Sequence, residues 1–223
     1  MLKYFFNIFL VMLSVQLFAQ DDAEEVEEKE KKEYKFHGVR VGANLIRAGR
    51  TFLGSGVETQ EIQVALGVNG VELNVDYGTE RNEILSDYQY VNEGSYLRFG
   101  IDRNFVKNPG SGNALSLGLR YATASFEDKL DFTVSDFDAP DTPQDLTFAN
   151  SDLNSWWLEL VFNLRGKIVS NLYTGFTLRW QFANTVNGQG LLKTFDIPGF
   201  GNTKRENSTA FDYYIMWRIP LRE

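Results

Sequence analysis

The chain has 223 residues, 43% of them hydrophobic, with 19 glycines and 5 prolines, which suits one sizeable domain better than two. Its formal net charge is −8 and it carries no basic stripe for phosphate backbones, which excludes nucleic acid as a partner. Because the chain has no cysteine, it can form no disulfide, no thiol centre and no lipid-modified N-terminal cysteine.

The N-terminal segment is typical of an exported protein. Residues 1–19, MLKYFFNIFLVMLSVQLFA, have Lys3 ahead of an apolar core and a plausible cleavage site after Ala19, which predicts a secretory signal peptide. Residues 20–35 form a charged leader, expected in the periplasm, with Glu–Lys pairs spaced for a short solvated helix. Few apolar residues are available to bury, so a mobile tail is favoured over a docking segment.

From residue 36 to residue 223, the dominant pattern is an apolar residue at every second position, which predicts strands with two unlike faces. Asn69-Gly70 stands between two such runs and predicts a tight hairpin. No internal run is long enough for a membrane-spanning helix. The alternation predicts eight strands, in chain order at residues 39–45, 61–68, 71–78, 96–102, 115–122, 156–163, 172–182 and 211–219.

The connections between these strands differ in length. Those after the second, fourth and sixth strands are comparatively short, and those after the third, fifth and seventh are longer. The link after the first strand, residues 48–57, is intermediate. Short turns at one end and long loops at the other are typical of an outer-membrane barrel, with its turns in the periplasm. We therefore predict an all-β fold, an eight-stranded antiparallel transmembrane up-and-down β-barrel, after the signal peptide and leader.

The residues on the polar face of the strands indicate which of the two faces meets lipid. In a narrow eight-stranded interior, buried charges must be paired, and interleaved glycines leave room for long side chains. Aromatic residues near the strand ends of the apolar face suit a lipid-facing girdle. A soluble lipocalin-like barrel would turn the apolar face inward, and a sandwich is a further alternative. The predicted interior charge network comprises Arg40, Arg98, Arg120, Arg179, Arg218, Glu61, Glu72, Asp76, Asp102, Glu159 and Asp212.

Four longer motifs resemble a family of small Gram-negative outer-membrane barrels known only as a domain of unknown function. They are SYLRFGIDRNFVKN, LSLGLRYATASF, WWLELVFNLRGKIVSNLYTGFTLRW and DIPGFGN, so the resemblance covers Gly38 to Leu221. It implies a barrel and supplies no activity. In architecture alone the chain is also similar to OmpX, the OmpA barrel and PorT-like accessory proteins, and fold does not transfer function.

Catalytic chemistry finds little support in the sequence. The single histidine, His37, stands at the entry to the first strand, whereas a rim-active hydrolase would need a histidine base at the outer end. No cluster of ligands suggests a metal, and the glycine-rich pieces lack the lysine of a phosphate loop. We expect no cofactor and no enzymatic activity, and we expect the interior carboxylates to neutralise arginines.

The segment DIPGFGN is the strongest candidate for a contact loop. Pro198, Gly199, Phe200 and Gly201 form a turn with an apolar tip in the longest connection. Such a turn either folds back onto the barrel mouth or contacts a partner. The expected partners are outer-membrane lipid and other outer-membrane or periplasmic proteins. The favoured function is a non-enzymatic structural or partner-binding barrel with a plugged interior. The alternative is an accessory subunit of a secretion or assembly machinery.

Overall fold

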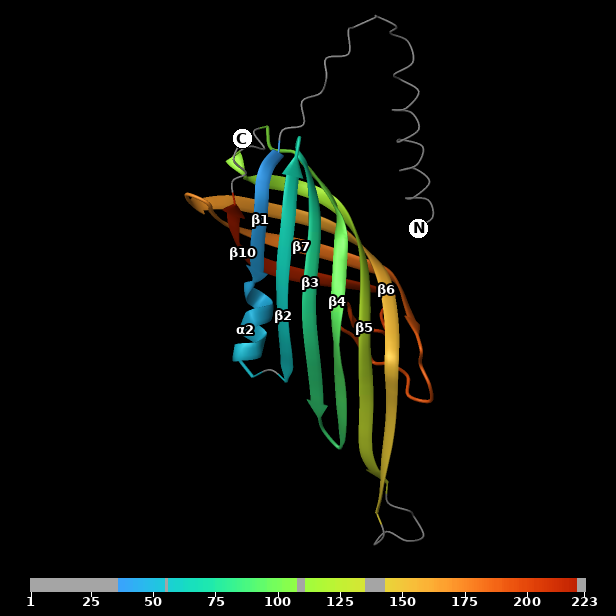
Figure 1. The fold of residues 1–223 in the computed structure, drawn as a ribbon. Coiled ribbons are helices and arrows are strands. Elements are labelled where there is room, and N and C mark those ends of the chain that lie inside the picture. The colour runs from blue at the N-terminus through green and yellow to red at the C-terminus, as the bar shows by residue number, and fades with distance from the viewer. Residues whose placement is uncertain (1–35, 55, 108–110, 135–142, 220–223) are drawn as a thin grey trace, which may run out of the picture. The chain divides into compact units, whose positions relative to one another are not determined.

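The computed structural model describes residues 36–54, 56–107, 111–134 and 143–219. The predicted signal peptide and the whole of the predicted leader, residues 20–35, lie outside these residues. The described chain forms one closed barrel in the order β1-β10-β7-β6-β5-β4-β3-β2, with a separate two-stranded sheet of β8 and β9 (Figure 1). The elements are β1 Phe36–Asn44, α2 Leu45–Phe52, β2 Val57–Val68, β3 Val71–Leu85, β4 Tyr88–Asn104, β5 Ala114–Val134, β6 Gln144–Val169, β7 Leu172–Asn187, β8 Asp196–Ile197, β9 Gly201–Asn202 and β10 Asn207–Ile219.

The barrel has up-and-down topology, because every neighbouring pair around the ring is antiparallel. The predicted all-β, eight-stranded fold is confirmed. The predicted hairpin at Asn69-Gly70 is also confirmed, and both residues have positive φ, at 48° and 79°. Two consecutive left-handed residues give the turn that matches the twist of the flanking strands. Ser170, with φ 42°, lies in the equally short turn between β6 and β7.

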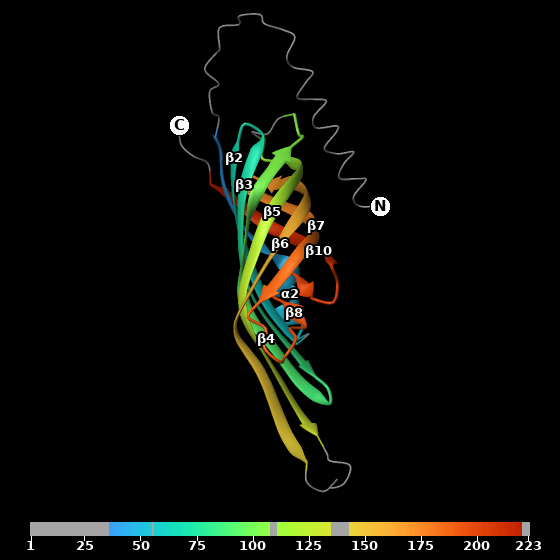
Figure 2. The same cartoon turned by 90° about the vertical axis from the view of Figure 1, so that its right-hand side faces the viewer.

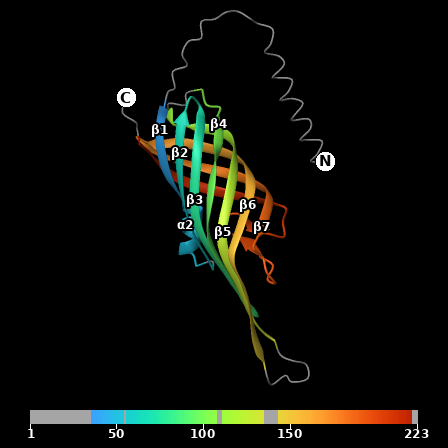
Figure 3. The same cartoon turned by 45° about the vertical axis from the view of Figure 1, so that its right-hand side comes forward.

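Most strands are longer than the sequence predicts, β3 to β6 by the most, and this corrects the predicted loops. β3 and β4 meet at Ser86-Asp87, so most of the expected long connection after the third strand is paired backbone. β5 runs to Val134 and β6 begins at Gln144, which shortens the next connection as well. The ends of β3 to β6 project beyond the other strands as two long hairpins, here called the extension (Figures 2 and 3). Its outward residues are mostly polar, so the apolar alternation that marks the strands in the barrel is lost here.

A helix replaces the end of the predicted first strand. Asn44 ends β1, and its side-chain oxygen accepts hydrogen bonds from the backbone N–H groups of Ile46 (3.1 Å) and Arg47 (3.2 Å). This cap satisfies N–H groups that would otherwise lack partners and starts α2, so Leu45 is helical. Among the described residues, no helix has both the length and the apolar character needed to cross a bilayer.

The two faces of the barrel have the polarity that the alternation predicts. Along β3, Leu73, Val75 and Tyr77 are exposed on the outside, whereas Glu72 and Asp76 are buried inside. All the remaining strands of the barrel have the same arrangement. The soluble lipocalin-like alternative does not fit, because the apolar face points outward. Exposed outward residues include Val41, Ile62, Val64, Leu97, Phe99, Ile101, Leu115, Leu117, Leu119, Leu158, Phe162, Leu164, Phe176, Leu178, Ile215 and Ile219.

Aromatic residues mark the edges of this apolar outer surface. Tyr121 stacks on Trp156 across β5 and β6, with ring centroids 6.1 Å apart. Tyr77 is the last apolar outward residue of β3 before Thr79 and Arg81. Trp217 lies near the other edge, opposite Leu172 at the start of β7. Rings at both borders of an apolar band are typical of barrels that sit in lipid.

Candidate functional site in the barrel interior

The interior of the barrel is lined by charged side chains from alternate strand positions. Ten of the eleven predicted network residues are buried there. The eleventh, Arg218, lies opposite Arg40 across the β1–β10 pair and is only half-buried. The structure divides the other ten into three layers along the barrel, described below from the end where β1 begins.

The first layer centres on Glu72. Its carboxylate lies 2.8 Å from Nη2 of Arg40, and it accepts hydrogen bonds from Nη1 (3.0 Å) and Nη2 (2.5 Å) of Arg165. All three residues are at most 7% exposed. Two guanidinium groups on one carboxylate leave an excess positive charge at this end of the interior.

The second layer is the pair of Arg120 and Asp102. Arg120 donates from both terminal nitrogens to the two carboxylate oxygens of Asp102, the Nη2 bond being 2.9 Å long. Asn74 (3.0 Å) and Asn163 (2.8 Å) donate to the same carboxylate. This is the bidentate geometry that makes arginine–carboxylate pairs strong.

The third layer centres on Arg179, whose guanidinium joins three carboxylates. Its Nε donates to Asp212 (2.7 Å), its Nη1 to Glu159 (3.0 Å) and its Nη2 to Asp76 (3.0 Å). The Tyr214 hydroxyl accepts a further bond from Nη2 (2.7 Å). Since all of these groups are almost fully buried, the arginine is paired in the way a dry interior requires.

Arg98 completes the third layer. It donates from Nη1 to Glu61 (2.5 Å) and from Nε to Glu159 (2.8 Å), and its guanidinium lies over the Tyr96 ring. Glu61 also accepts hydrogen bonds from the hydroxyls of Tyr96 (2.6 Å) and Tyr214. Each carboxylate therefore has several donors, which leaves little capacity to accept a proton from a substrate.

Three charged residues that bind to this network were missed by the sequence analysis. Arg47 enters from α2 and lies 3.0 Å from Glu80, 3.3 Å from Glu61 and 3.4 Å from Asp212. Glu80 and Arg165 continue the same alternation as the predicted residues of β3 and β6, so extending those strands would have found them. Nothing in the alternation indicates Arg47, because a helix carries it.

Part of the loop between β7 and β10, residues 196–200, is buried inside the barrel. Gly199 accepts hydrogen bonds at its carbonyl from Arg98 (2.8 Å) and Gln181 (2.9 Å), and its N–H donates to Glu80 (3.3 Å). The Asp196 carbonyl accepts a bond from Asn92 (3.0 Å). The loop thus meets the polar interior through its own backbone.

The apolar tip of this loop is buried as well. Phe200 packs edge-on against Trp157, with ring centroids 5.7 Å apart, in a cluster with Tyr96, Ile197 and Leu153. Pro198 and Gly199 are also buried, and Gly201 is half-buried. Of the two sequence-based alternatives, the loop folds back into the barrel mouth. In this arrangement Pro198 to Phe200 offer no surface to a partner.

Glycines on the inner face make room for the large side chains. Gly78 lies opposite Tyr96 across β3 and β4, and Gly118 lies opposite Asp102 across β4 and β5. A Cβ at position 78 would overlap the Tyr96 ring, and one at position 118 would overlap the Asp102 carboxylate. Gly100 serves Arg120 in the same way. The predicted interleaving of small and long interior residues is therefore a pairing across neighbouring strands.

The interior holds little free space between these layers. The cavity beside Glu72, Asp102 and Met216 measures ≈ 10 Å³, about the room of one water molecule. Among the described residues, no group of three or more histidines or carboxylates is arranged to hold a metal ion. The arrangement can hold the strands of the barrel rigidly against one another.

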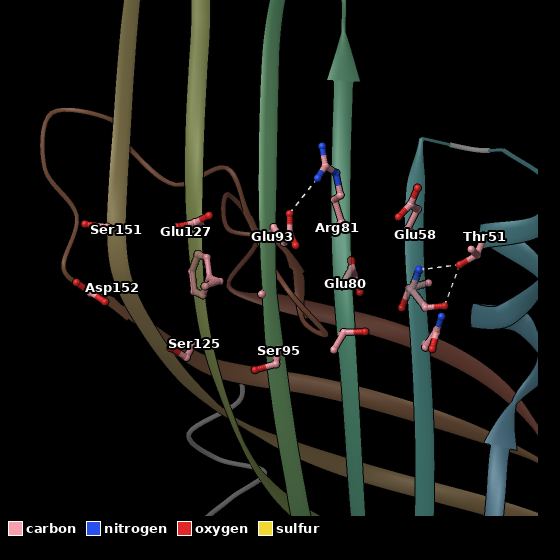
Figure 4. A pocket seen from close by; sticks show the side chains of 15 residues that line it. Thr51, Glu58, Glu80, Arg81, Glu93, Ser95, Ser125, Glu127, Ser151 and Asp152 are labelled. Carbon is pink, nitrogen blue, oxygen red and sulfur yellow. Dashed lines mark hydrogen bonds and ion pairs between the residues drawn. The ribbon is translucent and has the colours of Figure 1, made fainter.

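A larger polar hollow of ≈ 610 Å³ lies beyond the apolar band, alongside the start of β2 and the middle of β3 to β6 (Figure 4). Arg81 pairs with Glu93 on its wall at 3.1 Å, and Thr51 of α2 bonds to the backbone of Thr59. Its remaining side chains are mostly Ser and Glu. It contains none of the residues that the sequence predicts for a site.

These features define an up-and-down eight-stranded β-barrel with an apolar outer surface and a charged, packed interior. The chain belongs to the family described as domain of unknown function DUF6048, whose model matches residues 1–223. This confirms membership in a family without assigned activity. The specific likeness to OmpX, OmpA and PorT-like barrels stays a prediction.

Comparison with solved structures finds two similar chains, both crystal structures from Acinetobacter baumannii. CarO is 11% identical over 82% of this chain and 97% of its own, with a TM-score of 0.39. CarO2 is 9% identical over 84% of this chain and 100% of its own, with a TM-score of 0.40. No functional property follows from similarity at this level. No curated protein matches the chain.

Proposed function

We propose that the protein is a non-enzymatic integral β-barrel of the outer membrane, with a closed interior and a structural or partner-binding role. One observation carries the proposal: the polarity of the barrel is inverted relative to a soluble protein. Apolar side chains face outward on every strand, and Arg–carboxylate layers lie inside. In water this large apolar surface would be exposed at a cost in free energy, whereas in a membrane the lipid chains pack against it.

The height of the apolar surface supports a lipid environment. On β6 the outward apolar residues run from Trp156 to Leu164, which spans about 27 Å along the strand at 3.3–3.4 Å per residue. At a strand tilt of about 35–45° this is about 20 Å of height. With the side chains at its borders, this approaches the apolar band of about 25 Å in outer-membrane barrels. The predicted signal peptide, residues 1–19, would supply export.

The orientation follows from how far the chain projects at each end of the barrel. Two-residue turns follow β2 and β6 at one end, whereas the extension, α2 and the loop between β7 and β10 lie at the other. The Asn69-Gly70 turn lies at the end where β1 begins, since Phe36 pairs with Val68. Short turns face the periplasm in barrels of this kind, so the leader at 20–35 would lie there and the extension would stand outside the cell. Outer-membrane lipid is then the first partner of the protein.

The closed interior supports a role other than conduction. The buried charged layers, the contacts of the Gly199 carbonyl with Arg98 and Gln181, and the small size of the cavity beside Glu72 and Asp102, ≈ 10 Å³, support a plugged interior. The test combines fractionation with conductance. We expect the protein in outer membranes, with different gel mobility before and after boiling, and no steady conductance in planar bilayers. Recovery in the soluble periplasmic fraction, or large ohmic currents, would contradict the proposal.

The accessory-subunit alternative has the same barrel and differs only in having stable partners. It is favoured by the extension, whose strands continue well beyond the apolar band. Purification from native membranes separates the two cases. Stoichiometric recovery of the same outer-membrane or periplasmic proteins would support an accessory subunit, and recovery of the barrel alone would support a structural role.

A further inference from the structure

The inward and outward faces of the extension have the opposite polarity to those of the barrel from which it projects. Its outward residues on β5 and β6 are polar, and its inward residues Leu130, Phe132 and Phe148 are apolar. Phe132 stacks on Phe148 with ring centroids 5.9 Å apart. The apolar row continues into a cavity of ≈ 560 Å³ lined by Tyr88, Tyr90, Leu130, Phe132, Leu192 and Phe195. This is the pattern of a sheet that stands in water.

One edge of this sheet is open. β6 begins to pair with β7 only at Asn154, so Gln144–Ala149 have β5 on one side. On the other side, the described part of the chain provides no backbone partner for these residues. The loop that follows β7 reaches β6 at the next residue, Asn150. The Asn150 side chain accepts a hydrogen bond from the Gly190 N–H (2.8 Å) and donates one to the Leu192 carbonyl (3.0 Å).

The other gap in the ring is covered. β1 ends at Asn44, and α2 fills the space between β2 and β10 beyond it. Thr51 of α2 bonds to both the N–H and the carbonyl of Thr59 on β2. The contrast matters because proteins usually protect unpaired strand edges with a helix, a loop or a charge turned inward. At Gln144–Ala149, Leu146 and Phe148 turn apolar side chains inward instead.

We propose that the edge Gln144–Ala149 binds an extended polypeptide segment of a partner protein by strand addition. Free N–H and C=O groups along a strand recognise another strand, and alternate side chains give the specificity. Apolar residues of the partner opposite Leu146 and Phe148 would extend the inward row. The intervening residues would face outward beside Asp145. The proposal rests on the proposed function, which leaves the extension in water.

Charge identifies the outward residues of the partner. Around this edge the outward face carries four carboxylates against one ammonium: Glu127, Asp131, Asp145 and Asp152 against Lys129. Asp145 is exposed and its contact in the structure is with Thr133 (2.7 Å). The expected segment therefore alternates apolar residues with Lys or Arg. A second copy of this chain would instead bring acidic residues against acidic residues, which disfavours pairing between copies.

The test uses the folded full-length barrel in detergent and a labelled synthetic peptide of about ten residues in which Val alternates with Lys. We expect saturable binding by fluorescence anisotropy, with slower hydrogen exchange at 144–149. Leu146→Lys, which turns a charge inward at the edge, should weaken binding about tenfold or more. The matched control Gln89→Lys adds the same charge to β4, an inner strand of the same sheet, and should leave binding within about twofold.

Control peptides decide between strand addition and other contacts. A peptide N-methylated at alternate residues cannot form the ladder and should not bind, and one with Glu for Lys should bind far more weakly. Equal binding of either, no saturable binding, or association of two copies through β6 would overturn the inference. The gel shift of unboiled protein is recorded in the same samples. A folded barrel that binds no peptide rejects only this inference, whereas loss of the shift counts against the proposed barrel itself.

Discussion

Replacement of Arg120 by Met tests whether the interior is dry and fully paired. Arg120 and Asp102 are each 2% exposed, and Arg120 is bound to Asp102 through both terminal nitrogens. Methionine keeps most of the apolar stem and removes the charge. The Asp102 carboxylate would then retain only the amide donors of Asn74 and Asn163.

The expected cost follows from the burial of the pair. Removing one partner of a buried ion pair typically costs about 3–5 kcal/mol, because the other charge stays in the interior without compensation. The two asparagine donors offset part of this cost, so we expect about 3 kcal/mol for Arg120→Met. Asp102→Asn should cost a similar amount, since it leaves a buried guanidinium.

The double variant Arg120→Met with Asp102→Asn is the decisive comparison. It removes both charges, and the new amide can still interact with Asn74 and Asn163. We expect it to be more stable than either single variant, which gives a large coupling free energy. The assay is urea unfolding in lipid vesicles, followed by the fluorescence of the 4 tryptophans.

Two results would refute this reasoning. If Arg120→Met costs less than about 1 kcal/mol, the pair behaves like an exposed one and the interior contains water. If the two single costs add up in the double variant, Arg120 and Asp102 do not interact in the folded barrel.

Three further predictions concern the outer face, the glycines and the loop. Leu117→Arg places a charge on the apolar band and should cost about 2–4 kcal/mol in the vesicle unfolding assay. Gly118→Ala should cost about 1–3 kcal/mol, because its Cβ would displace the Asp102 carboxylate, whereas a Cβ at Gly166 would have no atom within 4 Å. Burial, with the charge of Glu80, raises the pKa of Asp196 from 3.8 to about 6. Ionisation of Asp196 therefore opposes folding. The stability that comes from keeping its carboxyl protonated is fully present below about pH 4 and is lost as the pH rises through about 6.

Each of these predictions has its own control. Ser116→Asn, a neighbouring inward change, should cost less stability than Leu117→Arg. The reverse order would mean that the inner and outer faces are wrongly assigned. Gly166→Ala should be neutral, and an equal cost at both glycines would remove the steric argument. Asp196→Asn should gain stability relative to the parent between pH 4 and pH 7, by up to about 3 kcal/mol. An identical pH profile for both proteins would mean that Asp196 does not titrate as stated.

Alternation predicted the barrel well because one property of each residue, apolar or polar, is read with a fixed period of two. Val71, Leu73 and Val75 face outward for the same reason that Glu72 and Asp76 face inward. Once the period is known, the face of every later residue on the strand follows. The interior charges could be predicted for this reason, and Glu80 and Arg165 obey the same rule beyond the predicted strand ends.

The rest depends on contacts that no local pattern encodes. Beyond Tyr77 the outward residues become polar while the strand continues, so the end of the apolar band was read as the end of the strand. Arg47 reaches the network only because Asn44 starts a helix. The position of Phe200 depends on the space beside Trp157, and neither neighbours the other in sequence.

The seam between β1 and β10 has a consequence for how the protein is made. Only Val39–Asn44 pair with β10, because α2 takes over beyond Asn44, whereas β4 and β5 pair along the whole of Tyr88–Asn104. β10 is also the last of the ring's strands in sequence order, so the ring can close only when residues 207–219 are present. Until then β1 and β7 each lack a neighbour and Arg179 lacks Asp212. A chain that lacks β10 would be an open sheet with unpaired edges, which are the kind of surface that aggregates.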